Sequence, residues 1–333
     1  MSYLKITGKR ILVTGGAGFI GSNLCDSLLQ NDNEVVCLDN FSTGKQENIQ
    51  DFLSLPRFKL IVGDIRIIDD CKKAVQGIDY ILHEAALGSV PRSINDPITT
   101  NQVNISGFLN MLVAARDAKV KRFVYAASSS TYGDLSEMPK VEERIGKPLS
   151  PYAITKYVNE LYAKNFHELY GLETIGLRYF NVYGPKQDPD GSYAAVIPLF
   201  TKLLMEHKSP VINGDGTNSR DFTYVENVIQ MNHLALISKN REVVGQIFNT
   251  AVGERNDLNL LVNLLKHYLI DYDPEITKVK IEYGETRSGD IPHSLASITK
   301  AQKLLNYHPQ FNLEKGLKLA VNWYWENLSS KQT

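Results

Sequence analysis

The chain has 333 residues, 43% of them hydrophobic, and this length exceeds the ~250–300 residues at which a single core stops growing, so we expect one large lobe and a smaller second lobe. Its 36 basic and 37 acidic residues give a formal net charge of −1, which argues against nucleic acid or an anionic membrane as the main partner. No run reaches the ~18 apolar residues of a membrane span, and no signal-like apolar segment precedes the first strand, so we expect a soluble cytoplasmic protein.

The first predicted unit is a buried strand that runs through a glycine turn into a helix. Apolar residues 11–13 precede Gly15, Gly18 and Gly21, and an amphipathic segment follows. Glycines at this spacing allow positive φ and let backbone N–H groups approach a pyrophosphate. The next strand ends at Asp39, close to the ~20 residues downstream where an acid would bind an adenosine ribose. The pattern predicts a dinucleotide site; an ordinary glycine-turned βαβ unit is the alternative.

The charge at the end of the second strand indicates which dinucleotide binds. An acid there suits two free ribose hydroxyls and repels a 2′-phosphate, for which an Arg would be expected. The residues after Asp39 are polar and turn-forming, and among them only Lys45 is basic. The sequence therefore predicts NAD rather than NADP.

After the second strand, apolar runs alternate with helical patterns, which is typical of a parallel sheet covered on both faces. We predict strands at 58–62, 80–83 and 122–127 and helices at 67–75 and 104–118. The carboxyl ends of the strands would face one crevice, where open α/β sheets bind ligands. The predicted fold class is α/β, a Rossmann-like doubly wound parallel sheet.

Two of these strand ends carry residues suited to a cofactor. Asp64 and Ile65 follow the third strand, where the adenine could lie. Ala85, Ala86 and Gly88 follow the fourth strand, and their small size lets a cofactor approach the strand end, although it would serve helix packing equally well.

A serine, a tyrosine and a lysine follow in the order that proton transfer would require. The fifth strand runs into Ser128, and the next helix opens with Ser150 as N-cap and Pro151 as its first residue. Tyr152 and Lys156 then share one helix face. An ammonium group can lower the pKa of a neighbouring phenol and bind a ribose, so we expect Tyr152 to exchange a proton while Ser128 orients the reacting oxygen. A surface helix pair is the alternative.

The second half of the chain is less regular. We predict helices at 194–206, 258–269, 300–305 and 313–324, and strands at 174–180, 210–213 and 246–251. The strand at 246–251 would return to the main sheet. We divide the chain into an NAD-binding domain, residues 1–180, and a smaller lobe, residues 181–333, wrapped onto it.

The cysteines and histidines do not indicate a metal site. Cys25, Cys37 and Cys71 have no metal-ligand spacing, and we expect buried free thiols. The seven histidines form no cluster in the sequence, and we expect no metal cofactor.

Five segments carry a resemblance to a known family. Residues 150–156 and 178–185 are close to signatures of the extended short-chain dehydrogenases/reductases and, within them, of the nucleotide-sugar 4-epimerases. Residues 85–93, 128–134 and 213–216 are more specific and resemble the UDP-N-acetylglucosamine 4-epimerases of bacterial surface-polysaccharide pathways. The resemblance covers essentially the whole chain. It implies reversible NAD-dependent 4-epimerisation of UDP-N-acetylglucosamine and UDP-N-acetylgalactosamine, or of their uronic acids.

The resemblance also implies roles for single residues. Tyr152 would be the base, Lys156 its tuner and ribose ligand, and Ser128 the hydroxyl on the sugar O4. With the residues that the pattern indicates, the expected cofactor set is Gly15, Gly18, Phe19, Ile20, Gly21, Asp39, Asn40, Ser42, Thr43, Gly44, Asp64, Ile65, Ala85, Ala86, Tyr152, Lys156 and Tyr179. A homodimer that pairs through helices near 104–118 and 152–169 is implied as well.

For the UDP-sugar, the resemblance implies a set of residues spread over both lobes. The expected substrate set is Gly88, Ser89, Ser128, Ser129, Tyr152, Asn181, Ala195, Val196, Asn213, Arg220, Arg287, Asp290 and Ser294. Within it, Ser89 and Ser129 would lie near the N-acetyl group, and Arg220 and Arg287 would clamp phosphates, since a planar guanidinium binds phosphate oxygens bidentately. Many relatives that act on glucose and galactose have a Tyr where this chain has Ser294, so the inferred pocket is wider here.

Three alternatives stay open beside this interpretation. A UDP-glucose/UDP-galactose 4-epimerase would share the mechanism. A sugar-nucleotide dehydratase or decarboxylase would carry an acid shortly after the fifth strand, where this chain has Ser129, Ser130 and Thr131. A non-enzymatic NAD-binding regulator would not need the Tyr152 and Lys156 pair, which is intact.

Overall fold

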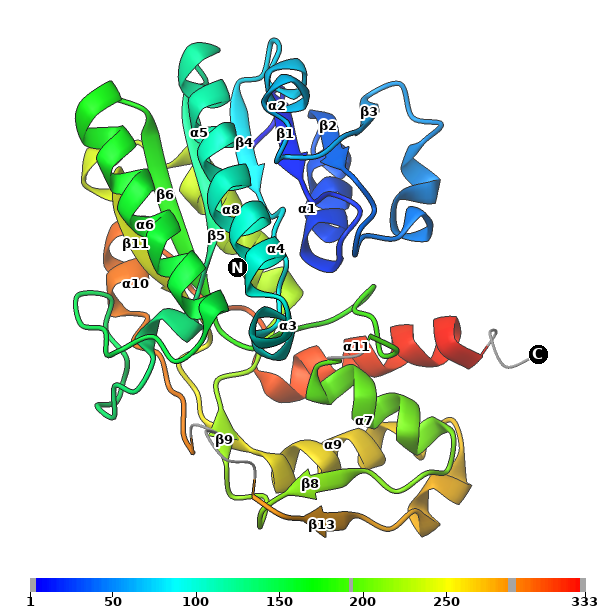
Figure 1. Ribbon diagram of the computed structural model, residues 1–333. Helices are drawn as coiled ribbons and strands as arrows, with labels where there is room; N and C mark the ends of the chain where they lie inside the picture. The colour runs from blue at the N-terminus through cyan, green and yellow to red at the C-terminus, as the bar shows by residue number, and fades with distance from the viewer. Residues whose placement is uncertain (1–3, 192–193, 287–291, 330–333) are drawn as a thin grey trace.

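A seven-stranded parallel sheet forms the centre of the molecule (Figure 1). The structure is a computed structural model that describes residues 4–191, 194–286 and 292–329. The order of the sheet is β3 (Phe58–Val62), β2 (Glu34–Asp39), β1 (Arg10–Thr14), β4 (Tyr80–His83), β5 (Arg122–Ser128), β6 (Glu173–Tyr179) and β11 (Gln246–Thr250). The Rossmann-like doubly wound fold class expected from the sequence is confirmed.

Two features of the strand order position the site. β1 lies between β2 and β4, so the chain reverses its direction of travel across the sheet at this point, and open α/β sheets bind ligands at such a reversal. At the other edge, Gln246 to Thr250 pair in parallel with Ile175 to Tyr179 of β6, so a strand from the second half of the chain completes the first sheet, as expected.

Helices cover both faces of the sheet. One face packs against α1 (Phe19–Gln30) and α8 (Val225–Ile237), and the other against α2 (Ile68–Ala74), α5 (Phe108–Asp117) and α6 (Pro151–Tyr170). Along β1, Ile11 and Val13 lie in the first of these cores and Leu12 in the second. Burial on both faces explains why the strands are continuous apolar runs in the sequence.

The sequence analysis did not predict α8. The helix buries Asn227, Gln230, Asn232 and His233 together with its apolar residues. A helix buried nearly all round has no polar face, so its sequence lacks the 3.6-residue alternation that indicates a surface helix.

The helical stretch predicted at 104–118 begins earlier, at Pro97, and is divided into three parts. A short helix, α4 (Pro97–Asn101), and a π-helical turn, Gln102–Gly107, precede α5. Within that turn, the Asn104 side chain is buried and accepts a hydrogen bond from the Leu87 N–H at 2.8 Å. The irregular turn therefore anchors the chain that follows β4.

The second lobe packs three helices against short strands (Figure 1). The helices are α7 (Val196–Met205), α9 (Leu258–Leu269) and α11 (Leu313–Leu328). The paired strands are β8 (Val211–Asn213) with β13 (Glu282–Gly284), β9 (Ser219–Arg220) with β12 (Asn256–Asp257), and β7 (Val182–Tyr183) with β10 (Thr223–Tyr224). The other α-helices of the described residues are α3 (Val90–Asn95) and α10 (Thr299–Leu305).

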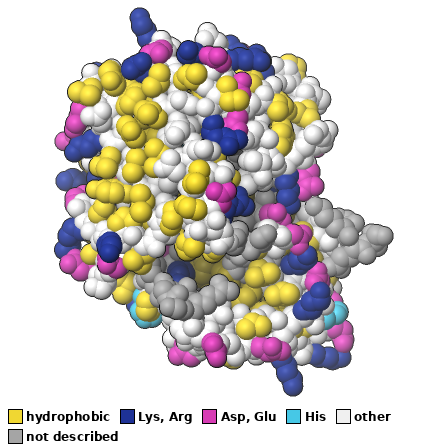
Figure 2. All heavy atoms as spheres, in the orientation of Figure 1, with side chains coloured by type: hydrophobic (Ala, Val, Ile, Leu, Met, Phe, Trp, Pro, Cys, Tyr) yellow, Lys and Arg dark blue, Asp and Glu magenta, His cyan; other side chains and the backbone are white. Residues whose placement is uncertain are grey.

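One face of the molecule exposes apolar side chains. Ile98 of α4 is 71% exposed, and Ile154 and Leu161 of α6 are 51% and 52% exposed. Figure 2 shows hydrophobic side chains gathered on the side where Figure 1 places α5 and α6. Over the described ranges, no helix has both the length and the apolar character needed to cross a bilayer. The three cysteines are buried and form no disulfide bond with one another.

Candidate active site

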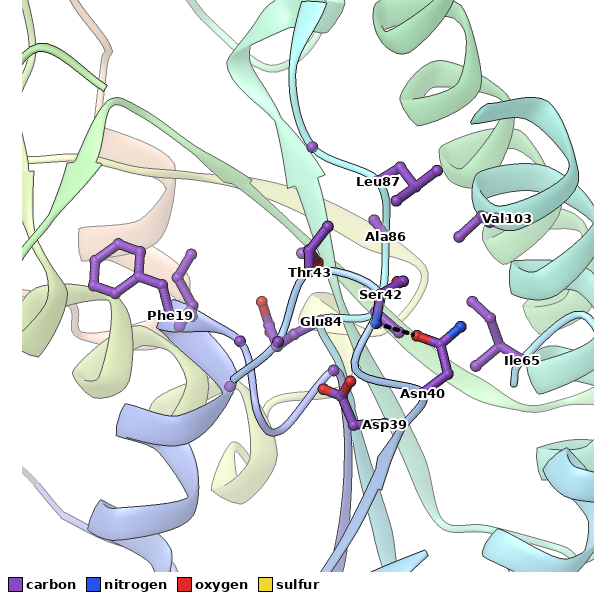
Figure 3. Close-up of a pocket in the computed structure, with 18 of the residues that line it drawn as sticks. Phe19, Asp39, Asn40, Ser42, Thr43, Ile65, Glu84, Ala86, Leu87 and Val103 are labelled. Carbon is purple, nitrogen blue, oxygen red and sulfur yellow. Dashed lines mark hydrogen bonds between the residues drawn. The ribbon is translucent and has the colours of Figure 1, made fainter. Parts of the chain in front are cut away.

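A pocket of about 450 Å³ opens at the carboxyl end of the sheet, within the ~300–1,000 Å³ typical of small-molecule sites (Figure 3). Every residue expected at the cofactor lines it: Gly15, Gly18, Phe19, Ile20, Gly21, Asp39, Asn40, Ser42, Thr43, Gly44, Asp64, Ile65, Ala85, Ala86, Tyr152, Lys156 and Tyr179. Of the expected substrate set, Gly88, Ser128, Tyr152 and Asn181 line the pocket.

The glycine turn after β1 leaves no room for side chains. Gly15 has φ +67°, and a Cβ there would lie 2.8 Å from the backbone nitrogen of Ala85 at the end of β4. A Cβ on Gly21 would lie 2.1 Å from the carbonyl oxygen of Gly15. The N-cap of α1 is Gly18, which provides no side-chain acceptor to the first helical N–H groups. The turn therefore presents a helix N-terminus suited to an anionic group.

Asp39 is fixed at the end of β2 by the main chain. Its carboxylate accepts hydrogen bonds from the N–H of Ala17 at 2.9 Å and of Phe41 at 2.8 Å. Burial raises the pKa of Asp39, while these two N–H groups oppose the rise. A carboxylate has about four lone-pair sites, so two remain for a ligand's hydroxyls.

Asp64 and Asn40 tie the ends of β3 and β2 together. The Asn40 side chain donates to Asp64 at 2.9 Å and accepts from the N–H of Ser42 at 3.0 Å, the contact dashed in Figure 3. Hydrogen bonding and charge from Arg66 lower the pKa of Asp64 to about 2. Figure 3 shows Ile65, which follows Asp64, facing the apolar side chains of Leu87 and Val103 across the pocket.

Tyr152 and Lys156 lie where the N-terminal half of α6 meets the pocket. Ser150 caps the helix by accepting a hydrogen bond from the N–H of Ala153 at 3.1 Å, as the sequence predicts. The Lys156 ammonium donates to the carbonyl oxygen of Ala126 on β5 at 2.7 Å and lies 5.9 Å from the centre of the Tyr152 ring. The helix and the fifth strand thus hold the tyrosine and lysine together.

The protonation of this pair differs from the sequence-based expectation. Burial raises the pKa of Tyr152, a hydrogen bond with Ser128 opposes the rise, and the charge of Glu84 adds to it. Burial also lowers the pKa of Lys156 to about 8, against the opposing charges of Glu84 and Glu160. In the protein alone, burial therefore dominates the pKa of Tyr152, and the group that opposes the rise is Ser128 rather than Lys156 as expected.

The Ser128 hydroxyl is oriented by its neighbour. Ser130 donates two hydrogen bonds to the Ser128 oxygen, from its N–H at 3.1 Å and from its hydroxyl at 2.9 Å. With its lone pairs occupied, the Ser128 hydroxyl hydrogen is left to point at another acceptor. Ser130 therefore orients Ser128 as a donor, a relation that the sequence analysis did not predict.

Glu84 is a site residue that the sequence analysis missed. It follows β4, lines the pocket, and accepts a hydrogen bond from the Tyr179 hydroxyl at 2.9 Å. Asn232 of α8 in turn donates to the Tyr179 oxygen at 2.9 Å. Burial raises the pKa of Glu84 to about 7 against the Tyr179 hydrogen bond and the Lys156 charge. An acid directly after a buried strand was the available signal.

Five further residues of the expected substrate set lie outside this pocket. Ser89 is the N-cap of α3 with φ +117°, and Ser129 begins the turn that follows β5. Ala195 and Val196 begin α7, and Asn213 ends β8. These five residues do not line the pocket.

Arg220 and Ser294 come close together in the second lobe. The Arg220 guanidinium donates to the carbonyl oxygens of Ser219 at 3.0 Å and Pro292 at 3.2 Å. The Ser294 N–H donates to the same Ser219 oxygen at 3.0 Å. Neither residue lines the pocket described above. Arg287 and Asp290 lie outside the described residues.

The residues present fit a dinucleotide. A Cβ at Gly15 or Gly21 would fill the space of the turn, α1 begins without a side-chain cap, and Asp39 presents free lone pairs one strand away. The first basic residue after Asp39 is Lys45, whose ammonium pairs with Asp188 at 3.0 Å, so an acid and not a base occupies the position at the end of β2 that would face a 2′-phosphate. Within the part of the chain that the structure describes, no group of three His, Cys, Asp or Glu side chains could hold a metal ion.

Comparison with known proteins finds the same family by sequence and by structure. Residues 11–251 match the NAD dependent epimerase/dehydratase family. A UDP-N-acetylglucosamine 4-epimerase from Methanobrevibacter ruminantium M1, solved with UDP-N-acetylmuramic acid, is 38% identical, with 96% of this chain and 99% of that chain covered and a TM-score of 0.89.

Two further solved structures bind other sugars. The UDP-glucose 4-epimerase of Thermotoga maritima, solved with UDP-glucose, is 35% identical over 96% of this chain and 99% of that chain, with a TM-score of 0.87. The UDP-glucuronic acid 4-epimerase of Bacillus cereus, solved with UDP-glucuronic acid and NAD, is 33% identical over 95% of this chain and 99% of that chain, with a TM-score of 0.85. Similar folds thus accompany three different sugars.

Proposed function

The chain belongs to the NAD dependent epimerase/dehydratase family and uses NAD, and from this premise we propose that it inverts C4 of UDP-N-acetylglucosamine and UDP-N-acetylgalactosamine. The observation that carries the reaction type is the grouping of Ser128, Tyr152 and Lys156 at one end of the cofactor pocket. The similarity to three UDP-sugar 4-epimerases supports the nucleotide and the position of the chemistry.

The choice of an N-acetylated sugar is supported by small side chains. Ser294 stands where the resemblance implies a bulky Tyr in many relatives that act on glucose, and Gly88 lines the pocket with no atom within 4 Å of its Cβ position. A packed site cannot absorb an acetamido group where a phenol fills the volume. The M. ruminantium enzyme, named for the same substrate, has the highest identity of the three structures compared.

The chain's residues divide the work of the proposed reaction. NAD, when bound, supplies the acceptor and later the donor of a hydride. The turn at Gly15 and Gly21 would hold the pyrophosphate, Asp39 a ribose of the adenosine, and Lys156 the second ribose. Tyr152 would take the proton of the sugar O4 and return it after the oxidised sugar has presented its other face. Ser128, oriented by Ser130, would donate a hydrogen bond to O4.

The remote UDP would anchor the sugar while it turns. We place the diphosphate near Asn181 and the phosphate clamps at Arg220 and Arg287, with the uracil at the N-terminus of α7 and its ribose at Asp290. Tight binding of the nucleotide lets the sugar be held loosely, which inversion requires. Ser89 and Ser129 would face the acetamido group.

The test is direct. We expect purified protein, incubated with UDP-N-acetylglucosamine and no added NAD, to form the C4 epimer observable by NMR. UDP-glucose and the two uronates are assayed in parallel. Faster turnover of UDP-glucose or of a uronate would reassign the substrate, and a 4-keto or decarboxylated product would replace epimerisation with elimination or decarboxylation.

We also propose that the exposed apolar face formed by Ile98, Ile154 and Leu161 is covered by a second copy of the chain. Monomeric proteins rarely leave such patches exposed. Light scattering of purified protein should give a dimer, and Leu161→Glu a monomer. The matched control is Leu319→Glu, which charges a leucine 46% exposed on α11 and should remain dimeric. A monomeric wild type would contradict the proposal.

A further inference from the structure

Glu84 adds a negative charge to a site in which Tyr152 already serves as the proposed base and Lys156 as the cation. It lines the same pocket as Tyr152 and Lys156 and accepts a hydrogen bond from the Tyr179 hydroxyl at 2.9 Å. The proposed mechanism gives it no proton to carry. A partly buried carboxylate in a pocket wall is stabilised by a compensating interaction.

The groups that face Glu84 identify that interaction. From α6 they are Lys156, whose charge acts on Glu84, and Tyr152, whose pKa Glu84 raises. From β6 it is Tyr179, which donates to the carboxylate, and α8 contributes the neutral Asn232 behind it. His83, next in the chain, faces Thr14 at 2.9 Å and stays uncharged, since burial lowers its pKa to about 3. Lys156 is thus the cation that Glu84 offsets.

We propose that Glu84 is a positioning residue that acts through charge: its carboxylate, which also offsets Lys156 when that group is ionised, keeps the bound cofactor in the oxidised form, NAD, between turnovers. The proposal rests on the proposed reaction. There the sugar C4 loses a hydride, two electrons with one proton, to the cofactor, O4 loses a proton to Tyr152, and both return to the sugar on its other face.

The charge of the nicotinamide ring depends on its oxidation state. The ring is positively charged when oxidised and neutral when reduced, so a nearby cation favours NADH and a nearby anion favours NAD. Lys156 alone would stabilise the reduced form and with it the oxidised sugar, which could then escape. With Glu84 and Lys156 both ionised, the net charge of the pair is zero, so the pair would no longer favour the reduced cofactor over the oxidised one.

The test is the midpoint potential of the bound cofactor, measured with mediators on the holoenzyme without any sugar. We expect Glu84→Gln to raise the ratio of NADH to NAD at a fixed potential by about tenfold, which is ~30 mV for this two-electron couple. The matched control is Glu226→Gln, which neutralises another partly buried glutamate with a raised pKa outside the pocket and should not move the potential.

The pH dependence separates charge from structural damage. At pH 9 Lys156, with its pKa of about 8, is mostly neutral, and the two proteins differ by the charge of Glu84, so the full shift is expected. At pH 6 Glu84, with its pKa of about 7, is protonated and as neutral as glutamine, so the shift should vanish. Equal potentials at pH 9, or a shift of the same size at both pH values, would overturn the proposal.

A second variant keeps the test open if Glu84→Gln does not fold. Tyr179→Phe removes the hydrogen bond that lowers the pKa of Glu84, so the pH below which NADH becomes favoured should move upward. An unmoved transition would overturn the proposal. Because no sugar is present, either result is independent of whether UDP-N-acetylglucosamine is the substrate.

Discussion

Asp39 and Ser294 are held in place in different ways. Asp39 ends the six-residue strand β2, which pairs with a parallel strand on each side; it is 7% exposed and accepts hydrogen bonds from two main-chain N–H groups. Ser294 lies outside any strand and is tied through its N–H to Ser219, which belongs to a two-residue strand. Asp39, in what we propose to be the cofactor half of the molecule, is thus held by long parallel strands, whereas Ser294, in the proposed substrate half, is held by one hydrogen bond between short segments.

This difference matches what each half has to do in the proposed reaction. A retained cofactor needs a site complete before it binds, and the pocket already collects every expected cofactor residue. A sugar that must rotate needs a site that can adapt, and three of the expected substrate residues lie on separate short elements: Val196 begins α7, Asn213 ends β8 and Arg220 ends β9. Changes in the first half should therefore alter catalysis and cofactor retention, and changes in the second half should alter the choice of sugar.

The largest effect is expected from Tyr152→Phe. The phenol is the proton acceptor in the proposed reaction, and the substitution leaves the cofactor contacts in place, so turnover should fall at least ~10²-fold while NAD stays bound. Turnover and the NAD content of the purified protein are measured together. Near-normal turnover would remove Tyr152 from the mechanism.

Gly21→Ala tests how tightly the cofactor half is packed. The new Cβ would meet the Gly15 carbonyl oxygen at 2.1 Å, so we expect a loss of about 1–3 kcal/mol in the free energy of unfolding and poorer NAD retention. Gly88→Ala is the matched control, because no atom lies within 4 Å of its Cβ position and its stability should not change. Equal losses in both variants would show that the close contact between Gly21 and Gly15 does not limit the packing of the turn.

Asp39→Ala should weaken NAD binding by about 1–3 kcal/mol, the range for losing hydrogen bonds to a charged group. The measurement is the NAD that remains on the protein after dialysis, compared with wild type. The substitution also frees the N–H groups of Ala17 and Phe41, so thermal unfolding is recorded to separate a binding loss from a general loss of stability. Unchanged retention would contradict the ribose assignment.

The same difference explains how far the sequence could predict the structure. The strands β3 and β4 and the helix α9 have the bounds expected, because buried parallel strands are unbroken apolar runs and α9 has a clear amphipathic pattern. α8 was missed because polar residues such as Asn227 and Gln230 are buried within it. The sequence placed Glu84 at a strand end, but the hydrogen bond from Tyr179 depends on β4 and β6 lying on either side of β5, which is a tertiary fact.

The smallest expected effect, and the one that tests the substrate half, is that of Ser294→Tyr. The Ser294 main chain is held by its own N–H, so the substitution changes the side chain while the bond to Ser219 stays. A phenol should fill the volume that an acetamido group needs, and overpacking of ~1–3 kcal/mol predicts a loss of about tenfold in kcat/KM for UDP-N-acetylglucosamine. UDP-glucose, whose C2 hydroxyl is several atoms smaller, should be spared or improved.

The control for that variant is Ser294→Ala, which keeps the space and should leave the ratio of the two specificity constants within a few-fold of wild type. Parallel losses on both sugars in Ser294→Tyr would mean that Ser294 supports the structure of the lobe, and retention of both would place it outside the sugar pocket. Either result would remove the main physical reason for an N-acetylated substrate. Ser294 does not line the cofactor pocket, so every variant at this position should retain NAD. Loss of NAD from Ser294→Tyr would instead show that the two halves are coupled and that their independence, inferred from how Asp39 and Ser294 are held, is wrong.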